Sequence, residues 1–498
     1  MANNDTVAVI MAAGKGTRLL SSVAKVLHRA GGRSLVEHVV GACKTAGITE
    51  IFVIVGHQAE DVSAAVLPLG AKAILQEPQN GTGHAMLVAR DAIGSSARYG
   101  LVLSGDAPLI RPTTLAWLLA EHQSSQAAAT LLTANLSHPT GYGRIVHKAD
   151  GDVAEIVEEK SATDNQRKIQ EINSGFYCFT LAKLWPCLDE LRPDNQHKEL
   201  YLTDTVRLLN QRGETVTSRV LSSAPDYTAE DAGEILGCNS RKDLAEVDRF
   251  FRRRKASALM RHTTIYFPET VVVDDEVETG DDTVIEPGVQ LLGKTHIGKN
   301  CTIRTGSILR NATLGDGVVV EPYTLIEESQ LGNNTVVGPF ARLRMHADVR
   351  ENARIGNFVE VKNSTLHEGA KSMHLTYLGD ASIGHHANIG AGTITCNYDG
   401  VNKNKTIIGE RAFIGSDTAL VAPVEVGDGA YVAAGSTITQ NVPADALGIA
   451  RGTQANKPGW AKARREKMAA AKAQKSAEAK AAAENAAEAL AATEKAKA

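Results

Sequence analysis

The hydrophobic residues follow two different patterns in the two parts of the chain. Up to about residue 238, short apolar runs alternate with longer stretches of mixed polarity, such as 35–46 and 83–92. The apolar runs are Val7–Met11, Ile51–Val55, Ala73–Leu75 and Leu101–Leu103. Runs of this length are typical of buried strands, and the longer stretches are typical of helices between them. The alternation predicts an α/β fold of βαβ units on a mostly parallel, Rossmann-like sheet.

Between residues 263 and 460 an aliphatic residue recurs at every sixth position, with an occasional spacing of five. The first series is Ile297, Ile303, Leu309, Leu314, Val320, Ile326, Leu331, Val337, Leu343, Val349, Ile355, Val361 and Leu366. The second series is Ile383, Ile389, Ile408, Ile414, Leu420, Val426, Val432 and Ile438. Each six-residue unit makes one flat side of a triangular coil, and the coils stack as parallel strands about 4.8 Å apart. The repeat predicts a parallel β-helix.

The repeat is broken in two places, at 367–382 and at 396–407. A regular solenoid has no structural use for such breaks, so we expect two projecting loops with a function. Four candidate residues lie in or beside them: His374, Tyr377, Asn397 and Tyr398. A histidine out of register beside a second irregular loop fits a catalytic role better than a structural one.

Two further segments complete the division of the chain. Residues 239–262 have helical spacing and heavy charge, and predict a connecting helix whose RRRK cluster forms a solvated face rather than a polyanion site. Residues 461–498 are mostly Ala, Lys and Glu and predict a frayed helix or a disordered tail. We therefore expect domains at 1–238 and 263–460, joined by the helix and followed by the tail.

Composition excludes several classes of protein. The net charge of −4 gives no reason to expect nucleic acid as a partner. No stretch approaches the roughly 20 apolar residues of a membrane span. The six cysteines form no CxxC pair, which favours reduced thiols in a cytosol over a disulfide framework or a zinc site.

The first apolar run leads into a glycine-rich basic turn, Gly14-Lys15-Gly16-Thr17-Arg18, which has the wrong order for a Walker A motif. Glycines let backbone N–H groups approach an anion, and a helix beginning nearby would add its positive dipole end. Lys15, Arg18 and Lys25 supply charge for two or more phosphates. Taken alone, the turn is equally compatible with a solvated basic loop.

Two other features favour a nucleotide site. Gln76 precedes Gly81-Thr82-Gly83, a turn suited to close approach by a flat base. Asp106 follows the run Leu101–Leu103 and so lies at the carboxyl end of a strand, where ligands bind in open α/β sheets. A single aspartate there is a plausible ligand for Mg²⁺, and the alternative is that it caps a helix before Pro108.

Several motifs together resemble a known family. MAAGKGTR, Lys25-Val26-Leu27, GTGHA, SGDAPL, GYGRI, IVEEK and EINSG resemble a sugar-nucleotide pyrophosphorylase domain. With the β-helix behind it, the chain up to about residue 460 resembles the bacterial bifunctional N-acetylglucosamine-1-phosphate uridyltransferases/glucosamine-1-phosphate acetyltransferases. The resemblance implies a left-handed β-helix, a cytoplasmic homotrimer, and synthesis of UDP-N-acetylglucosamine for peptidoglycan and lipopolysaccharide.

The resemblance also implies which residues bind the nucleotide sugar. Residues for UTP and the sugar would be Met11, Ala12, Ala13, Gly14, Lys25, Gln76, Gly81, Thr82, Gly143, Glu158, Asn173 and Asn239. Mg²⁺ would be bound by Asp106 and Asn239. A sugar-1-phosphate oxygen would attack the α-phosphorus of UTP and release pyrophosphate. Ser104 departs from a tyrosine found in some members.

For the second site, the resemblance makes His374 the base that frees the amine of glucosamine-1-phosphate to attack acetyl-CoA, with Asn397 helping to position it. Residues for glucosamine-1-phosphate would be Arg344, Lys362, Tyr377 and Asn388. Residues for acetyl-CoA would be Ala391, Asn397, Tyr398, Ser416, Ala434 and Arg451. One departure is Met345-His346, where the family usually has Pro-Gly, so the shape of that loop is an open question.

Two other classes of function are compatible with the same domain plan. A nucleotidyltransferase with one activity could use the β-helix only to oligomerise, and a regulatory assembly subunit could have neither activity. The survival of both residue sets, from Lys25 and Asp106 to His374 and Asn397, favours the two-site enzyme.

Overall fold

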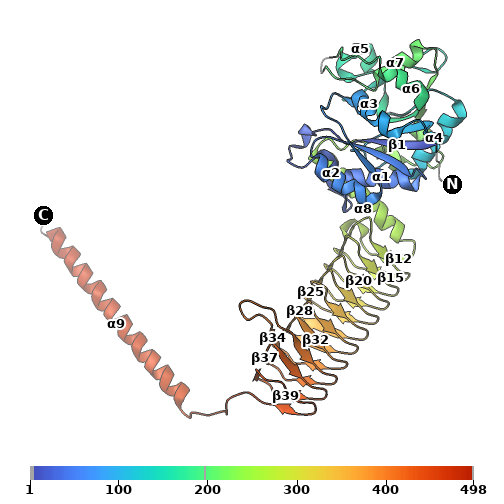
Figure 1. The fold of residues 1–498 in the computed structure, drawn as a ribbon. Coiled ribbons are helices and arrows are strands. Elements are labelled where there is room, and N and C mark those ends of the chain that lie inside the picture. Colours follow the sequence, from blue (N-terminus) through green and yellow to red (C-terminus); the bar gives the residue numbers. More distant parts are fainter. Residues whose placement is uncertain (1–4, 196–197, 496–498) are drawn as a thin grey trace.

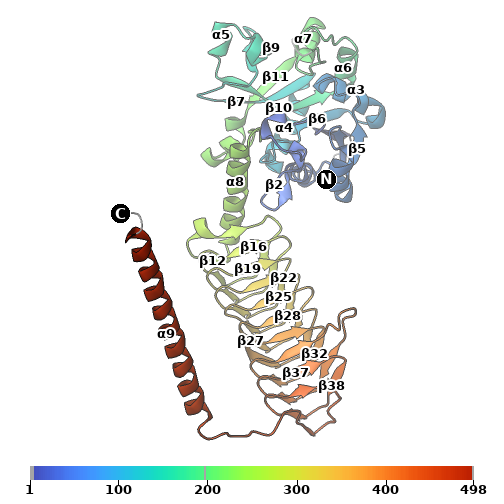
Figure 2. The ribbon, with the colours of Figure 1, turned by 90° about the vertical axis from the view of Figure 1, so that its left-hand side faces the viewer.

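The structure is a computed structural model that describes residues 5–195 and 198–495. An α/β domain at one end is joined by a long helix to a straight β-helix, and a last helix extends away from it (Figure 1). Turning the molecule by 90° shows the connecting helix α8 standing between the two folded parts (Figure 2).

The first domain is built on one mixed sheet. Its strands are β1 Thr6–Met11, β4 Glu50–Val55, β5 Lys72–Leu75, β6 Tyr99–Ser104, β7 Ala129–Asn135, β8 Arg144–His147, β9 Val153–Val157, β10 Glu171–Thr180 and β11 Val216–Val220. The order is β11-β7-β10-β6-β1-β4-β5, with β8 and β9 attached through β10. Strands β6, β1, β4 and β5 run parallel, as predicted, whereas β10 is antiparallel to both of its neighbours in that order.

Helices cover both faces of this sheet, so its central strands β1, β4 and β6 are apolar and almost entirely buried. Helices α1 (Leu35–Thr45), α2 (Ala59–Val66) and α4 (Pro112–Ser125) pack on one face. Helices α3 (Thr82–Ile93), α6 (Leu181–Leu188) and α7 (Asp204–Gln211) pack on the other. The smaller elements are the hairpin β2 (Arg29–Ala30) and β3 (Arg33–Ser34) and helix α5 (Asp164–Arg167). The layered α/β architecture predicted from the alternation is confirmed.

The second domain is a parallel β-helix with three faces. The first face contains β12 Thr263–Ile265, β15 Thr283–Ile285, β18 Thr302–Ile303, β21 Val319–Val320, β24 Val336–Val337, β27 Arg354–Asn357, β30 Lys371–His374, β33 Asn388–Ile389, β36 Phe413–Ile414, β39 Tyr431–Val432 and β41 Leu447–Gly448. The second face contains β13 Val272–Val273, β16 Gln290–Leu292, β19 Ile308–Arg310, β22 Leu325–Glu327, β25 Arg342–Arg344, β28 Glu360–Lys362, β31 Tyr377–Gly379, β34 Ile394–Cys396, β37 Ala419–Val421 and β40 Thr437–Ile438. The third face contains β14 Glu278–Thr279, β17 His296–Ile297, β20 Thr313–Leu314, β23 Gln330–Leu331, β26 Asp348–Val349, β29 Thr365–Leu366, β32 Ala381–Ile383, β35 Thr406–Ile408 and β38 Val424–Val426.

The six-residue pattern accounts for the stacking of these faces. Leu291 pairs with Leu309, and Leu309 pairs with Ile326, so equivalent residues lie 18 or 17 positions apart. These spacings are three units of six, or two of six and one of five. The aliphatic residues of all three faces form one continuous buried core. We name the turn between the first and second faces the first corner, and the turn between the second and third faces the second corner.

The first of the two predicted interruptions is wrong. Residues 367–382 form β30, β31 and β32, which continue all three faces without a projecting loop. Ser372 pairs with Ile355 and is fully buried at the inward position, and Leu378 fills the next one. The prediction failed here because Ser372, with its small hydroxyl side chain, occupies an inward position at which the six-residue repeat expects an aliphatic residue.

The second interruption is a true loop. Thr395 pairs with Leu420, a spacing of 25 instead of 17 or 18, and the extra residues leave the coil at the second corner. An antiparallel bridge between Tyr398 and Lys403 closes the loop on itself, and Val401 at its tip is 84% exposed. Side-chain and backbone groups of this loop therefore lie outside the β-helix, as predicted.

Helix α8 (Arg241–Leu259) is the predicted connecting helix, but its RRRK cluster is not a solvated face. Arg252 donates to Asp248 and to Asp274 in the first coil at 2.8 and 2.7 Å, and Arg254 is half-buried. The hairpin β2–β3 joins the same contact, because the N–H of Gly31 donates to Asp248. The ion pairs of Arg252 and the hydrogen bond from Gly31 therefore connect helix α8 to the first coil of the β-helix and to the first domain.

The last helix, α9 (Trp460–Lys495), makes a regular helix from the Ala, Lys and Glu-rich segment. Every side chain that the structure describes in it is exposed, as expected for a sequence with almost nothing apolar to bury. Over the described parts of the chain, no helix combines the length and apolar character needed to cross a membrane.

Candidate active sites

A cavity of about 980 Å³ opens at the carboxyl edge of β1, β4 and β6 in the first domain. Ten of the residues predicted for the nucleotide and metal line it: Met11, Ala12, Ala13, Gly14, Lys25, Gln76, Gly81, Thr82, Asp106 and Asn239. They come from segments far apart in the sequence, and the parallel strands bring their ends to one edge of the sheet.

The glycine-rich turn follows β1 directly and folds back on Lys25. Gly16 has φ +60°, and a Cβ at this position would lie 2.5 Å from the Cβ of Lys25, so only glycine allows the approach. The helix expected after this turn is absent, because Thr17–Leu19 forms only a three-residue 3₁₀ turn. The expected helix dipole is therefore wrong, and positive charge at the turn comes from side chains and single N–H groups.

Lys25 lies between the two predicted metal ligands. Its ammonium forms an ion pair with the carboxylate of Asp106 and lies 2.8 Å from Oδ1 of Asn239. A guanidinium nitrogen of Arg18 donates to the same amide oxygen at 2.8 Å. Two oxygen donors thus converge on one cation, and oxygen donors are the ligands that Mg²⁺ prefers.

Hydrogen bonds from neighbouring residues hold these two oxygen ligands in place. The hydroxyl of Ser104 donates to Oδ1 of Asp106 at 2.5 Å, and the N–H of Cys238 donates to the carbonyl of Asp106 at 2.8 Å. Asn239 stands directly before the capping box of α8, in which Ser240 and Asp243 bond each other, and its N–H also donates to Asp243. The start of α8 therefore carries Asn239 to the end of β6.

The opposite side of the cavity carries the residues predicted to read the base. Gln76 is buried, and its amide nitrogen donates to the carbonyl of Gly81 at 2.9 Å. Gly81 has φ +96°, and a Cβ there would lie 2.5 Å from the carbonyl oxygen of Leu200. The hydroxyl of Thr82 accepts from the N–H of Leu202 at 3.0 Å. The turn and the segment around residue 200 form one wall.

Three predicted sugar residues lie together but are not among the residues that line the cavity. The N–H of Asn173 donates to the carbonyl of Gly143 at 2.9 Å, and its amide nitrogen donates to the hydroxyl of Tyr177 at 2.7 Å. Burial raises the pKa of Glu158, with a smaller contribution from the nearby charge of Asp204. The three residues lie outside the cavity, directly before β8, directly after β9 and within β10.

Sequence reasoning missed Glu199 and Tyr201, which also line the cavity. No family motif quoted above covers them, and they follow two residues, 196–197, that lie outside the described part of the chain. Their neighbour Leu200 is fixed by hydrogen bonds to Asn80 and Gly83, which explains how this segment reaches the site.

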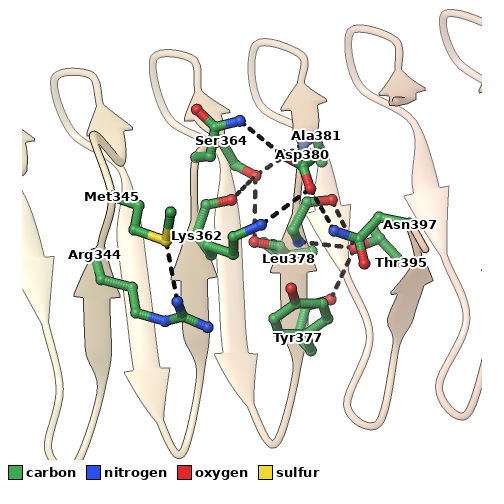
Figure 3. A network of polar contacts seen from close by, with 12 residues as sticks. Arg344, Met345, Lys362, Ser364, Tyr377, Leu378, Asp380, Ala381, Thr395 and Asn397 are labelled. Atoms are coloured by element: carbon green, nitrogen blue, oxygen red, sulfur yellow. Dashed lines mark hydrogen bonds and ion pairs between the residues drawn. The ribbon is translucent and has the colours of Figure 1, made fainter. Parts of the chain in front are cut away.

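A second cluster of functional residues lies at the second corner of the β-helix (Figure 3). Asp380 stands at its centre: it pairs with Lys362 at 3.2 Å and accepts hydrogen bonds from the amides of Asn363 and Asn397. Burial would raise the pKa of Asp380, but these bonds from Asn363, Asn397 and Lys362 lower it overall. The carboxylate thereby fixes the ammonium of Lys362 and the amide of Asn397 at one place.

Lys403 is a second lysine at this corner that the sequence reasoning missed. It lies on the projecting loop, and the nearby positive charge of Lys362 lowers its pKa. Burial would lower the pKa of Lys362, but the pairing with Asp380 raises it overall. The loop thus brings a second amine beside the first, an arrangement that suits a phosphate.

His374 lies at the first corner, on the last residue of β30. Its Nδ1 bonds the side-chain oxygen of Asn357, one coil earlier, at 3.0 Å. An amide oxygen only accepts, so Nδ1 carries the hydrogen and Nε2 keeps its lone pair. Within the described residues of the single chain, Asn357 orients the ring, and no contact joins His374 to Asn397 at the second corner. Positioning of His374 by Asn397 stays a prediction.

The loop after Arg344 has its own shape. Nε of Arg344 donates to Glu360 at 2.7 Å. Figure 3 shows the Arg344 side chain near Lys362, with a contact to Met345. Met345 and His346 have φ +53° and +64°. Proline fixes φ near −65°, so a Pro-Gly pair could not follow this path. The cation is therefore retained on a loop that differs locally from the family's usual pattern.

Four of the six residues predicted for acetyl-CoA form a line along the first corner, whereas Asn397 lies at the second corner. Asp417 N–H donates to the carbonyl of Ala391, and Gly435 N–H donates to that of Ser416, at 2.7 and 2.8 Å. Arg451 donates to the carbonyl of Ala434 at 2.8 Å. Tyr398 lies apart, exposed on the projecting loop, and Asn388 lies on the first face in β33.

The fold and the two clusters define a transferase with a nucleotidyltransferase domain and a hexapeptide-repeat acyltransferase domain. Residues 8–200 match the MobA-like NTP transferase domain family, and residues 276–311 and 405–440 match the bacterial transferase hexapeptide family of six repeats.

Whole-chain comparison is more specific. The bifunctional protein GlmU of Koribacter versatilis is 47% identical over 92% of this chain and 97% of its own length. Those of Geotalea uraniireducens and Listeria monocytogenes are 42% and 44% identical over 92% and 91% of this chain and 99% and 98% of theirs. The chain belongs to the GlmU family. It is a bifunctional enzyme that catalyses acetyl transfer and uridylyl transfer in UDP-N-acetylglucosamine synthesis.

Proposed function

We propose that uridylyl transfer takes place in the cavity of the first domain. The observation that carries this assignment is the convergence of Lys25, Asp106 and Asn239 at one sheet edge. Lys25 and Arg18 neutralise phosphate charge while Gln76 and Gly81 bind the uracil edge. With the sugar held by Gly143, Glu158 and Asn173, a phosphate oxygen of N-acetylglucosamine-1-phosphate attacks the α-phosphorus of UTP, and pyrophosphate leaves.

Asp106 and Asn239 would hold Mg²⁺ at this site. The fit rests on the two oxygens, of Asp106 and Asn239, that both contact the ammonium of Lys25. In the described ranges, no cluster of three or more His, Cys, Asp or Glu residues suited to a metal occurs. Mg²⁺ usually takes one or two protein ligands and completes its shell with water and phosphate. When bound, it supplies positive charge for the transferring phosphoryl group.

Acetyl transfer takes place on the β-helix, across the second face. Arg344, Lys362 and Lys403 at the second corner bind the phosphate of glucosamine-1-phosphate, with Tyr377 and Asn388 beside the sugar. A three-residue strand spans roughly 10 Å, a distance that a hexose phosphate can bridge to the first corner.

There His374 removes a proton from the attacking amine through Nε2, while Nδ1–H stays bonded to Asn357. Ala391, Ser416, Ala434 and Arg451 line the path of acetyl-CoA along the same corner. Asn397 and Tyr398, which the resemblance also implies for acetyl-CoA, lie at the second corner of this chain. The amine nitrogen forms the new bond to the acetyl carbon, and the CoA thiolate is the leaving group.

We propose that the enzyme is a homotrimer. Tyr323, Phe340 and Phe358 stack along the first corner with ring centroids 5.5 Å apart, and each is at least half exposed in the single chain. All three adopt a left-handed backbone conformation that is unfavourable for residues with a Cβ. An exposed aromatic row of this kind is typical of a protein interface, and a second copy on it would also cover the open side of His374.

The proposed location is the cytoplasm. The six cysteines are all free, which suits a reducing compartment. The proposed division of work follows the chain: uridylyl transfer in 1–238, a connecting helix in 239–262, acetyl transfer in 263–460 and a tail in 461–498. The substrates are small molecules, and no role for nucleic acid is proposed.

The test is a coupled assay with glucosamine-1-phosphate, acetyl-CoA, UTP and Mg²⁺, each omitted in turn. His374→Ala should reduce acetyl transfer by roughly 10²-fold or more and leave uridylyl transfer near wild type. Asp106→Ala should abolish only the Mg²⁺-dependent uridylyl transfer. Full acetyl transfer in the first variant would refute the role of His374, and loss of both activities in the second would indicate misfolding.

A further inference from the structure

The ammonium of Lys25 occupies the position proposed for the metal ion. In the proposed function it binds phosphate, yet in this structure its ammonium lies between the two proposed metal ligands. Lys25 and Asp106 are both sheltered, with 14% and 18% of their side chains exposed. An ammonium and a divalent cation cannot occupy the same place between Asp106 and Asn239, because like charges in a sheltered site repel strongly.

The two ligands do not depend on Lys25 for their positions. Asp106 is fixed by Ser104 and by the N–H of Cys238, and Asn239 is fixed by Asp243 in the cap of α8. The oxygens therefore stay together when the lysine leaves. Lys25 itself ends in a flexible four-carbon chain, so its ammonium can move while its backbone stays in place.

We propose that Lys25 is a resident cation of the metal site in the nucleotide-free enzyme. Its ammonium satisfies Asp106 and Asn239 until a divalent cation and the nucleotide enter, and then it transfers to the phosphates. This proposal rests on the proposed function, since it takes Asp106 and Asn239 as the metal ligands. In the nucleotide-free enzyme Lys25 competes with the metal ion for Asp106 and Asn239. In the enzyme with metal and nucleotide bound, Lys25 and the metal ion bind the phosphates together.

The consequence is that metal and nucleotide bind cooperatively. Without nucleotide, a metal ion has to displace the ammonium into water, so its affinity is low. With nucleotide present, the phosphates accept the ammonium and also contribute metal ligands, so each ligand strengthens the binding of the other by the same factor. Arg18 cannot replace Lys25 in this role, because it donates to Asn239 from a solvent-exposed position.

The test measures binding of Mn²⁺ to the full-length, nucleotide-free protein by electron paramagnetic resonance. Lys25→Met removes the ammonium and keeps the length of the chain. We expect this variant to bind Mn²⁺ at least about tenfold more tightly than wild type, a difference of about 1.4 kcal/mol. Lys72→Met, which removes an exposed lysine paired with Glu50 on β5, controls for net charge and should leave the affinity unchanged.

Addition of UTP supplies the second measurement. UTP should strengthen Mn²⁺ binding in wild type much more than in Lys25→Met, because only wild type has an ammonium to transfer. Unchanged or weaker Mn²⁺ binding by Lys25→Met without nucleotide would overturn the proposal. A circular dichroism spectrum and an unfolding midpoint of the first domain like those of wild type would show that this variant is folded, so such a result could not be attributed to misfolding.

A third variant separates this proposal from the assignment of the metal site. Asp106→Asn placed on Lys25→Met should abolish the gain in Mn²⁺ affinity. If the tight binding survives, the ion is bound elsewhere, and the assignment of Asp106 as a ligand is refuted together with the role of Lys25. If the gain is absent from the start while wild type with UTP still binds Mn²⁺ through Asp106, only the resident-cation proposal fails.

Discussion

The carboxylate of Asp380 lies 3.2 Å from the ammonium of Lys362, one coil earlier at the same corner of the β-helix. Only 6% of the lysine side chain and 11% of the aspartate side chain are exposed. Stacking makes this pair possible, because each coil places its corner residue directly over the one before. A sheltered pair of this kind is costly to break, since the remaining charge then has no partner.

Asp380→Asn should weaken the binding of glucosamine-1-phosphate. The amide carries no charge and has one acceptor oxygen instead of two, so Lys362 loses its ion pair and one of the two amides, Asn363 or Asn397, loses its acceptor. We expect KM for the sugar phosphate to rise by about tenfold, equivalent to about 1.4 kcal/mol, with uridylyl transfer unchanged. Steady-state acetyl transfer assays measure this. Glu368→Gln, an exposed acid on a neighbouring corner, is the matched control, and equal KM values for the two variants would contradict the role of Asp380.

Asn357→Ala should lower kcat for acetyl transfer by about tenfold, a part of the roughly 10²–10⁴-fold that general-base catalysis contributes, because His374 loses the bond that orients its ring. Asn357→Asp should instead retain the bond and add a negative charge, which favours the protonated imidazole and raises the pKa of His374. The acid limb of the kcat/KM profile should therefore move to higher pH. Asn352→Ala, at an exposed corner of the preceding turn, controls for the loss of an amide, and an unshifted profile in Asn357→Asp would argue against the contact.

How far the sequence predicts the β-helix site depends on the kind of residue. The six-residue period located the coils, and the family motifs located His374 and Lys362. Asn357 was missed because it belongs to no motif, and its link to His374 appears only when residues 17 positions apart are stacked. Ser372 misled the interpretation for a related reason: stacking, not side-chain type, defines its inward position.

In the first domain, too, some residues could be located from the sequence, whereas others are placed only by the fold. The end-of-strand position of Asp106 predicted its place at the sheet edge, because parallel strands bring their ends together. The absent helix after Gly16 could not be foreseen, since glycine permits both a helix start and the tight return toward Lys25 that the structure has. Nothing in the local sequence around Asn239 shows that the backbone of Cys238 bonds Asp106, a contact across more than a hundred residues.

Gly81→Ala should impair uridylyl transfer alone. A Cβ at Gly81 would lie 2.5 Å from the carbonyl of Leu200, in a backbone region that disfavours alanine. The wall beside Gln76 must shift, and we expect at least about a tenfold loss, or roughly 1.4 kcal/mol of transition-state stabilisation. Gly94→Ala is the control: it shares a positive φ but has open space around it, so it should retain activity. Equal effects of the two would implicate backbone strain instead of the contact.

His122 should make the first domain sensitive to acid. Burial lowers its pKa to about 4, with a smaller effect of Lys183, and its two nitrogens bond the hydroxyls of Thr130 and Thr180. The unfolded chain takes up this proton below about pH 6.5, so between about 6.5 and 4 it binds more protons than the folded chain. Stability therefore falls with falling pH in that window, by about 3 kcal/mol in total.

This acid sensitivity is measurable as the pH dependence of the first domain's unfolding free energy. His122→Gln removes the titrating group and should flatten the profile between pH 6.5 and 4, whatever its effect at neutral pH. The exposed His138→Gln should leave the slope as in wild type. A slope unaltered by the first substitution would show that other groups cause the acid sensitivity.

The spacing of 17 or 18 residues per coil has a consequence for how this enzyme can change length. Every coil adds one strand to each face, so the separation between the uridylyl and acetyl sites is fixed in whole layers of about 4.8 Å. Removing or duplicating one complete coil between Asp274 and Arg342 would move one catalytic centre relative to the other without disturbing either. The architecture therefore permits the distance between the two proposed sites to vary in steps of one coil while the residues of each site stay the same.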